Sequence, residues 1–314
     1  MRLVTGGAGF IGSHIVARLL EQGESVRVLD NLSSGKRSNI NSLIGEIEFV
    51  EGDIRDAEVV QRAAKGVDTI FHHAAEPSVP RSIADPKGTY DVNVTGTLNV
   101  LLAARDSGCQ RVVFASSSAV YGDSPEMPKH ERMIPALLSP YASSKLAGEG
   151  LCQVFSRSFG IEAVSLRYFN VFGPRQDPNS AYAAVIPRFL EALTTGTNPV
   201  IYGDGEQSRD FIFIDNVVNA NLLAAMVPGV AGRAYNIAAG KSVTLLGMLA
   251  DVAELVGIEA NPRHEEPRAG DIRHSLADIS AATSELGYHV TVPFEDGLRR
   301  TVASMVETRL VAAQ

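Results

Sequence analysis

A glycine-rich octapeptide, TGGAGFIG at residues 5–12, is the sequence feature that most constrains the fold. It directly follows a short β-rich run, Arg2–Thr5, and opens an apolar stretch with helical periodicity. In this strand–turn–helix context, the spacing Gly7-x-Gly9-x-x-Gly12 is typical of a loop whose backbone amides approach a pyrophosphate at a helix N-terminus. The octapeptide therefore predicts an α/β fold with a dinucleotide site near the N-terminus.

Short β-rich runs alternate with helical stretches through the first half of the chain. The predicted strands are Arg2–Thr5, Ser25–Asp30, Ile47–Gly52, Asp68–Ala74, Arg111–Ser116 and Glu162–Leu166. This alternation indicates a doubly wound parallel sheet of the Rossmann type.

After about residue 167 the pattern becomes irregular and rich in Gly, Pro and Asn, with further helices predicted near 184–195, 215–226 and 244–256. We interpret this part as a smaller α/β lobe that covers the substrate. The expected dinucleotide-binding domain comprises 1–166 plus about 209–235, and the expected substrate-binding lobe comprises about 167–208 and 236–314.

Composition excludes several classes of partner. The formal charge is −8 and there is no dense Lys/Arg run, which argues against nucleic acid and against an anionic membrane surface. No run approaches the ~18 apolar residues that a membrane span needs, and the N-terminus predicts a strand instead of a signal peptide, so a cytoplasmic location is expected.

Neither the cysteines nor the paired histidines indicate a metal site. Cys109 and Cys152 show no metal-type spacing and are predicted to be buried thiols. His72 and His73 are adjacent at a strand end, where consecutive side chains point to opposite faces of the sheet. No metal is therefore expected.

The second predicted strand ends in Asp30, eighteen residues beyond Gly12. A carboxylate at this position accepts hydrogen bonds from a ribose and repels a 2′-phosphate, so NAD is favoured over NADP. Lys36 and Arg37 lie close by in the sequence and leave an NADP interpretation open.

The hexapeptide PYASSK at residues 140–145 places Tyr141 and Lys145 four positions apart, on one face of a predicted helix. A free phenol has a pKa of about 10, so action as a base near neutrality requires a drop of roughly three units, or about 4 kcal/mol. One ammonium at ~4 Å contributes about 4 kcal/mol at an effective dielectric of about 20. A bound nicotinamide cation adds to this, so Lys145 together with NAD⁺ suffices to make Tyr141 a general base, although the Tyr-Lys pair by itself would also fit an ordinary helix surface.

Several motifs together resemble the extended short-chain dehydrogenase/reductase superfamily over essentially the whole chain. They are Gly6-x-x-Gly9-x-x-Gly12, Asp53-Ile54, His73-Ala74-Ala75, Asn93, the serines at 116–118 and Tyr141-x-x-x-Lys145. The resemblance implies that Tyr141 is the general base, that Lys145 lowers its pKa and binds the nicotinamide ribose, and that Ser117 bridges the substrate hydroxyl.

The resemblance also implies a set of residues that bind NAD. They are Gly6, Gly9, Phe10, Ile11, Gly12, Asp30, Asn31, Asp53, Ile54, Ala74, Ala75, Asn93, Tyr141, Lys145 and Tyr168.

The residue that follows Ser118 bears on the reaction. Sugar-nucleotide 4,6-dehydratases of this superfamily carry Asp-Glu immediately after the catalytic Thr, and the related glucuronate decarboxylases carry Glu where this chain has Ala119. Alanine cannot move a proton. The resemblance then favours 4-epimerisation, in which carbon 4 of the sugar is transiently oxidised, the keto sugar rotates, and the same hydride returns to the other face.

Four blocks of the second lobe resemble UDP-hexose 4-epimerases: RYFNVFGPRQDP (167–178), AAVIPRF (183–189), YGDGEQSRDFIFIDNV (202–217) and RAGDIRHS (268–275). The substrate contacts that this resemblance implies are Ser78, Ser117, Asn170, Tyr202, Arg209, Arg268, Asp271 and Ser275. An ordinary turn serine fits Ser78 equally well. The small Ser275 resembles the branch that accepts N-acetylhexosamines, where glucose-restricted members carry a bulky aromatic residue.

Two alternatives to this function stay open at this stage. The same oxidation could act on another nucleotide sugar, such as a pentose or a dTDP- or GDP-linked sugar, or the chain could be a non-catalytic NAD-sensing protein. By resemblance, helices around 94–107 and 142–159 pair into a homodimer interface, although their apolar faces would also suit an internal core.

Overall fold

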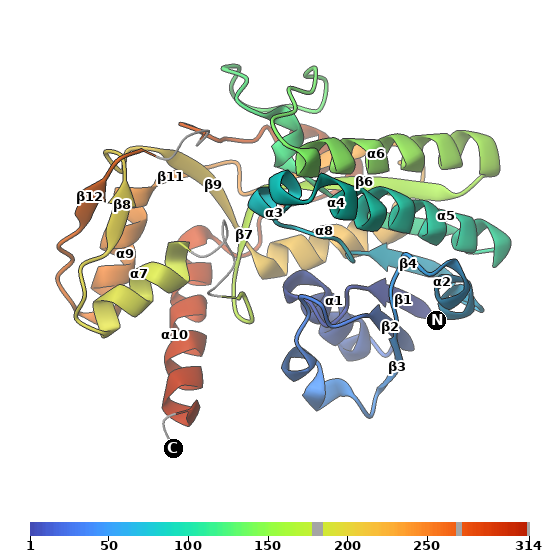
Figure 1. Ribbon diagram of the computed structural model, residues 1–314, viewed down its shortest axis with the longest axis horizontal. Helices are drawn as coiled ribbons and strands as arrows, with labels where there is room; N and C mark the ends of the chain where they lie inside the picture. The colour runs from blue at the N-terminus through green and yellow to red at the C-terminus, as the bar shows by residue number, and fades with distance from the viewer. Residues whose placement is uncertain (178–184, 268–271, 313–314) are drawn as a thin grey trace.

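Seven parallel strands form the sheet that organises the molecule (Figure 1). The computed structural model describes residues 1–177, 185–267 and 272–312. The strand order is β3-β2-β1-β4-β5-β6-β10. The strands are β1 (Arg2–Thr5), β2 (Val26–Asp30), β3 (Ile47–Glu51), β4 (Thr69–His72), β5 (Arg111–Ser117), β6 (Glu162–Tyr168) and β10 (Ala234–Ile237).

Helices cover both faces of this sheet (Figure 1). On one face α2, α5 and α6 pack together, with α3 and α4 beside α6, while α1 and α8 pack on the other face. The bounds are α1 (Phe10–Glu21), α2 (Ala57–Ala64), α3 (Val79–Ala84), α4 (Pro86–Tyr90), α5 (Gly96–Asp106), α6 (Pro140–Phe159) and α8 (Ile214–Met226). A π-helical turn, Asp91–Thr95, joins α4 to α5, and 3₁₀ turns lie at Arg37–Asn39, Asn41–Leu43 and Ser118–Tyr121.

The central strands are apolar because helices bury them from both sides. Successive residues of one strand enter different cores: Leu3 packs in the core under α2, α5 and α6, and Val4 packs in the core under α1 and α8. Ile70 and Phe71 on β4 divide in the same way, and all four side chains are at most 1% exposed.

A second lobe stands beside the large sheet and is built around two small sheets (Figure 1). One has the order β11-β9-β7 and the other pairs β12 with β8. Its elements are β7 (Asn170–Phe172), α7 (Val185–Thr194), β8 (Val200–Tyr202), β9 (Ser208–Phe213), β11 (Ser242–Thr244), α9 (Leu245–Val256), β12 (Arg263–Glu265), a π-helical turn (Ala282–Leu286) and α10 (Phe294–Ala312).

The fold class predicted from the sequence is confirmed, and the differences are local. Strand β4 ends at His72, two residues before the predicted end, because the N–H of Ala74 bonds to the side-chain hydroxyl of Thr5 instead of a backbone carbonyl of the neighbouring strand β1. Strand β6 runs on to Tyr168, where it still pairs with Ser117 of β5. The seventh strand, β10, was not predicted. The domain limits given above stay a prediction.

The strand order places a topological switch point between β1 and β4, because the chain runs outward from β1 to β3 and then returns to start β4. Ligands of doubly wound sheets bind outside the carboxyl ends of the strands at such a point. The register brings Thr5 of β1 opposite His72 of β4 at this edge. The glycine-rich loop follows β1 here, so both the predicted loop and the switch point indicate the same site.

Cys109 and Cys152 are buried free thiols, as predicted. Across the described parts of the chain, no helix combines the length and the apolar character that crossing a membrane requires.

Candidate active site

The glycine loop is shaped by contacts that a side chain would prevent. Gly6 has φ +70°, and a Cβ on it would lie 2.6 Å from the backbone nitrogen of Ala74. A Cβ on Gly12 would lie 2.2 Å from the carbonyl oxygen of Gly6. Gly9 is the N-cap of α1, and no side chain in the described structure caps this helix end. The first N–H groups of α1 therefore face outward with the positive end of the helix dipole, which suits a pyrophosphate.

Asp30 lies at the end of β2 beside this loop and is 6% exposed. Its carboxylate accepts from the backbone N–H of Ala8 at 2.9 Å and of Leu32 at 2.8 Å. Burial raises its pKa, against the effect of these two bonds. The nearby cations are engaged elsewhere: Lys36 pairs with Asp177 at 3.3 Å, and Arg37 lies over the ring of Phe49. Nothing in this arrangement directs a cation to a 2′-phosphate, which agrees with NAD.

Asn31 and Asp53 lie together beyond the ends of β2 and β3. The Asn31 amide donates to Asp53 at 2.8 Å, and Arg55 donates two guanidinium hydrogen bonds and one backbone hydrogen bond to the same carboxylate. The Arg55 hydrogen bonds hold the pKa of Asp53 down at about 2. Ile54 is buried against Gly96, so its side chain belongs to the core under α2, α5 and α6.

Asn93 clamps the loop after β4. Its amide oxygen accepts from the N–H of Glu76 at 2.7 Å, and its amide nitrogen donates to the Glu76 carbonyl at 3.1 Å and to the Ser144 hydroxyl at 2.9 Å. Asn93 thereby fixes the segment after Ala74 and Ala75, which are both partly buried, and Ala74 lies against Gly6 of the glycine loop. Both hydrogens of the Asn93 side-chain amide are used in these bonds, so this amide has no further hydrogen to donate to a cofactor.

Tyr168 ends β6 and stacks on His73, with ring centroids 6.0 Å apart and an interplanar angle of 8°. The Tyr168 hydroxyl donates to Asn221 at 3.0 Å, and His73 Nε2 lies 3.1 Å from the same amide oxygen. His72 on the opposite face bonds to Thr5 instead. The two histidines are thus on different sides of the sheet, and no group of three His, Cys, Asp or Glu suited to a metal is found in the part of the chain that is described.

The predicted catalytic residues come together at the carboxyl end of β5. Tyr141 and Lys145 lie on the first turns of α6, which Ser139 caps by accepting from the N–H of Ala142. Ser117 ends β5, and its hydroxyl lies close enough to the Tyr141 phenol to favour a lower pKa of Tyr141. Lys145 Nζ donates to the Ala115 carbonyl at 2.8 Å and lies 5.8 Å from the centroid of the Tyr141 ring.

The expected lowering of the Tyr141 pKa is not what the protein alone produces. Burial raises the pKa of Tyr141, and the Ser117 hydroxyl only partly opposes this. The Ala115 carbonyl holds the Lys145 ammonium, which lies 5.8 Å from the centroid of the Tyr141 ring. Burial also lowers the pKa of Lys145 to about 8. Because burial raises the pKa of Tyr141, a positive charge near the phenol besides that of Lys145 would favour its action as a base.

A buried charge network under this site was not predicted. Glu149, on the same face of α6 as Lys145, accepts from the Ser116 hydroxyl at 2.5 Å and from Arg167 at 2.9 and 2.7 Å. Arg167 also donates to the Tyr121 hydroxyl at 2.9 Å. The four-residue spacing after Lys145 is the sequence signal that could have indicated Glu149. Its Arg167 partner becomes apparent only when β5 and β6 are paired.

Three predicted substrate residues lie around β9 in the second lobe. Asn170 donates to the Asp210 carbonyl at 3.3 Å. The Arg209 guanidinium donates to the carbonyl of Ser208 at 3.0 Å, and Ser275 is 9% exposed with its N–H on the Ser208 carbonyl at 3.0 Å. The structure therefore places Asn170, Arg209 and Ser275 on one small sheet and the segment beside it.

Asp210 organises this region, although the sequence did not single it out. Its carboxylate accepts three backbone N–H bonds, from Ala239 at 2.8 Å, Gly240 at 3.0 Å and Ala277 at 3.2 Å. Ala239 and Gly240 follow β10 of the large sheet, whereas Ala277 follows Ser275. Asp210 thus ties the lobe that carries Arg209 to the edge of the large sheet.

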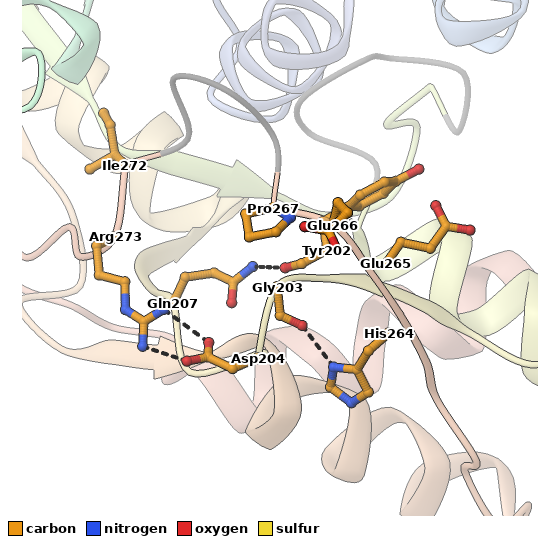
Figure 2. Close-up of a pocket in the computed structure, with 10 residues that line it drawn as sticks. All are labelled: Tyr202, Gly203, Asp204, Gln207, His264, Glu265, Glu266, Pro267, Ile272 and Arg273. Atoms are coloured by element: carbon orange, nitrogen blue, oxygen red, sulfur yellow. Dashed lines mark hydrogen bonds and ion pairs between the residues drawn. The ribbon is translucent and has the colours of Figure 1, made fainter.

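Tyr202 ends β8 and lines a hollow of about 590 Å³ between β8 and residues 264–267 and 272–273 (Figure 2). The amide of Gln207 donates to the Tyr202 carbonyl at 2.7 Å, and Arg273 pairs with Asp204 at 2.7 Å on the same wall. The predicted Arg268 and Asp271 lie outside the described residues.

Ser78 caps α3, where its hydroxyl accepts from the N–H of Arg81 at 3.2 Å. Ser78 therefore has a structural role as a helix cap, which supports its interpretation as an ordinary turn serine. Its side chain stays partly exposed, so a second hydrogen bond to a ligand is compatible with this role.

The family model described as the NAD dependent epimerase/dehydratase family matches residues 2–238. A UDP-glucose 4-epimerase from Mycolicibacterium smegmatis is 40% identical over 96% of this chain and 96% of its own length. The structure of a UDP-N-acetylglucosamine 4-epimerase from Methanobrevibacter ruminantium, in complex with UDP-N-acetylmuramic acid, matches with TM-score 0.93 at 41% identity, over 98% of both chains.

A UDP-glucose 4-epimerase from Thermus thermophilus, solved in complex with NAD, matches with TM-score 0.88 at 39% identity over 98% of this chain and 99% of its own. Decarboxylases and dehydratases are also relatives, including a Xenopus tropicalis UDP-glucuronic acid decarboxylase at 31% identity over 96% of this chain and 70% of its own length. The glycine cradle, Asp30 and the uncapped end of α1 fit NAD, which is the cofactor of this family. The chain belongs to the NAD-dependent epimerase/dehydratase family, within the extended short-chain dehydrogenase/reductases.

Proposed function

We propose that the protein is a UDP-hexose 4-epimerase that interconverts UDP-glucose and UDP-galactose and also UDP-N-acetylglucosamine and UDP-N-acetylgalactosamine. The observation that carries this proposal is the assembly of Tyr141, Ser117 and Lys145 at the sheet edge with Ala119 two residues beyond Ser117. The backbone N–H of Ala119 donates to the Ser117 hydroxyl, and the methyl side chain of Ala119 carries no acidic group. The site therefore has groups for oxidation and reduction but lacks the extra acid at the position where dehydratases and decarboxylases carry one.

In this reaction Ser117 holds the hydroxyl of sugar carbon 4 by a hydrogen bond, and Tyr141 removes its proton. The glycine loop, the N-terminus of α1 and Asp30 would hold NAD⁺, which would supply the acceptor and donor of the carbon 4 hydride and a positive charge near Tyr141. Tyr141 then returns the proton to the new hydroxyl, so the sugar gains and loses no atoms. Lys145 supports the phenolate because its ammonium stays close to the ring.

The nucleotide half of the substrate fits the second lobe. A diphosphate needs cations in an acidic protein, and Arg209 lies on β9 next to Asn170 and Ser275. Ser275 leaves more room than the aromatic residue of glucose-restricted relatives, which favours a pocket that admits an acetamide.

A panel of nucleotide sugars tests the proposal. The purified protein is incubated with UDP-glucose, UDP-N-acetylglucosamine, UDP-xylose, UDP-glucuronate, dTDP-glucose and a GDP-hexose, and products are separated by chromatography. We expect 4-epimers from both UDP-hexoses. Conversion of only a pentose, dTDP or GDP sugar would move the function to another epimerase. Release of CO₂ from UDP-glucuronate would contradict the role given to Ala119.

We also propose a cytoplasmic homodimer that pairs through α5 and α6. Val154 and Phe159 on α6 are 52% and 46% exposed, which supports a helix face that is covered in an assembly. Light scattering of the purified protein is expected to give twice the 33.5 kDa chain mass. Replacing Val154 by Glu is expected to produce monomers, and a monomeric parent protein would contradict the proposal.

A further inference from the structure

Buried His72 has a hydrogen-bond partner at each ring nitrogen. Its Nδ1 lies 2.7 Å from the Thr5 hydroxyl oxygen on β1, and its Nε2 lies 3.0 Å from the Thr97 hydroxyl oxygen on α5. The side chain is 1% exposed, so water does not compete for either nitrogen. A neutral imidazole can take two tautomeric forms, and the bonds of its neighbours determine which form is present.

The neighbours of His72 leave one consistent arrangement. The Thr97 hydroxyl donates to the Asn93 carbonyl at 2.6 Å, so the bond between Thr97 and the ring must run from His72 Nε2–H to the Thr97 oxygen. The unprotonated Nδ1 then accepts from the Thr5 hydroxyl, whose oxygen accepts from the N–H of Ala74 at 3.2 Å. Burial lowers the pKa of His72 to about 3, which keeps the ring neutral.

The two ends of this chain of hydrogen bonds reach the two halves of the active site. At one end, Ala74 lies against Gly6 of the cofactor loop, so closely that a Cβ on Gly6 would lie 2.6 Å from the Ala74 nitrogen. At the other end, the Asn93 amide donates to the Ser144 hydroxyl at 2.9 Å, and that hydroxyl donates to the Tyr141 carbonyl at 2.8 Å.

We propose that His72, as the neutral tautomer protonated on Nε2, is a positioning residue that couples the cofactor loop to the first turn of the catalytic helix. The Nδ1 bond positions the loop through Thr5 and Ala74, and the Nε2 bond positions Tyr141 through Thr97 and Asn93. The second half rests on the proposed function, since it takes Tyr141 as the base, whereas the first half depends only on NAD binding.

A simpler role for His72 would be to fill the core. Its ring lies 5.8 Å from the ring of Phe114 at an interplanar angle of 34°, which an apolar ring could reproduce. Under that role, His72→Phe keeps both NAD binding and turnover. Under the proposal, the phenylalanine leaves the Thr5 hydroxyl without its acceptor and the Thr97 oxygen without its donor. NAD binding and turnover are then both weakened.

Two amide variants separate the two bonds. In His72→Asn, the amide group takes the place of Nδ1, so it keeps an acceptor for Thr5 and loses the donor to Thr97. In His72→Gln, the amide reaches the place of Nε2, so it keeps the donor to Thr97 and loses the acceptor for Thr5. The measurements are the rate of NAD dissociation from the holoenzyme and kcat at saturating NAD and UDP-glucose.

We expect His72→Asn to lower kcat about tenfold with NAD dissociation unchanged, and His72→Gln to speed NAD dissociation about tenfold with kcat at saturating NAD unchanged, each the effect of one lost buried hydrogen bond. Wild-type behaviour of His72→Phe, or equal loss of both properties in the two amide variants, would overturn the proposal.

A spectroscopic measurement covers the case in which the variants fail to fold. In the holoenzyme labelled with ¹⁵N-histidine, His72 is expected to show a proton on Nε2 only, with no titration between pH 5 and pH 8. A proton on Nδ1, or titration in this range, would refute the tautomer. This result and the NAD dissociation rates stand even if the panel of nucleotide sugars contradicts the proposed reaction.

Discussion

Glu149→Gln is the substitution whose effect on stability can be worked most directly from the structure. Glu149 and Arg167 form an ion pair at 2.7 Å with side chains that are 9% and 6% exposed. The glutamine keeps the shape of the side chain but removes the charge. Its amide N–H₂ faces the N–H groups of Arg167, so one donor lies against another where the carboxylate accepted a hydrogen bond. Removing one partner of a buried pair leaves an uncompensated charge and costs about 3–5 kcal/mol. This is a large fraction of the roughly 5–15 kcal/mol that stabilises a domain.

Urea denaturation followed by circular dichroism measures this loss, and an exposed pair supplies the control. Arg18 and Glu21 pair at 3.0 Å with side chains 37% and 67% exposed, so Glu21→Gln is expected to cost less than about 1 kcal/mol. The double variant Glu149→Leu/Arg167→Met removes both charges and is expected to be more stable than Glu149→Gln. A loss below about 1 kcal/mol in Glu149→Gln would refute the reasoning.

Three further predictions concern the site and its pH dependence. Tyr141→Phe is expected to retain NAD while kcat falls at least about 100-fold, the scale of general acid–base catalysis; wild-type kcat would exclude Tyr141 as the base. Ser275→Tyr is expected to lower turnover of UDP-N-acetylglucosamine at least about tenfold more than that of UDP-glucose, and equal losses would remove the pocket argument. Burial raises the pKa of Asp210 from 3.8 to about 6, so folding takes up a proton there. Relative to Asp210→Asn, the free energy of unfolding of the wild type is expected to fall by about 2 kcal/mol as the pH rises from 4 to 6.5, and parallel pH profiles would contradict this.

The parts of the fold that could be predicted are those in which neighbouring residues carry the signal. The loop from Gly6 to Gly12 and the strand before it are recognisable because turn, strand and helix patterns follow each other directly. The strand β10 was missed because its four residues have no strong alternation, and it exists through pairing with β6, far away in the sequence.

The site divides in the same way. The pairing of Tyr141 with Lys145 follows from helical spacing alone, and the structure places both beside Ser117. The partners of His72 are 67 and 25 residues away, so no local pattern contains them. The raised pKa of Tyr141 was also beyond the sequence, because it depends on burial and on the carbonyl that holds Lys145.

The central claim is that carbon 4 of the sugar is oxidised and reduced by one hydride that stays in the active site. UDP-glucose carrying deuterium at carbon 4 tests it most directly, with the UDP-galactose product analysed by mass spectrometry after conversion in ordinary water. We predict that the product retains the deuterium in full at carbon 4. Loss of the deuterium to water during epimerisation would contradict the account.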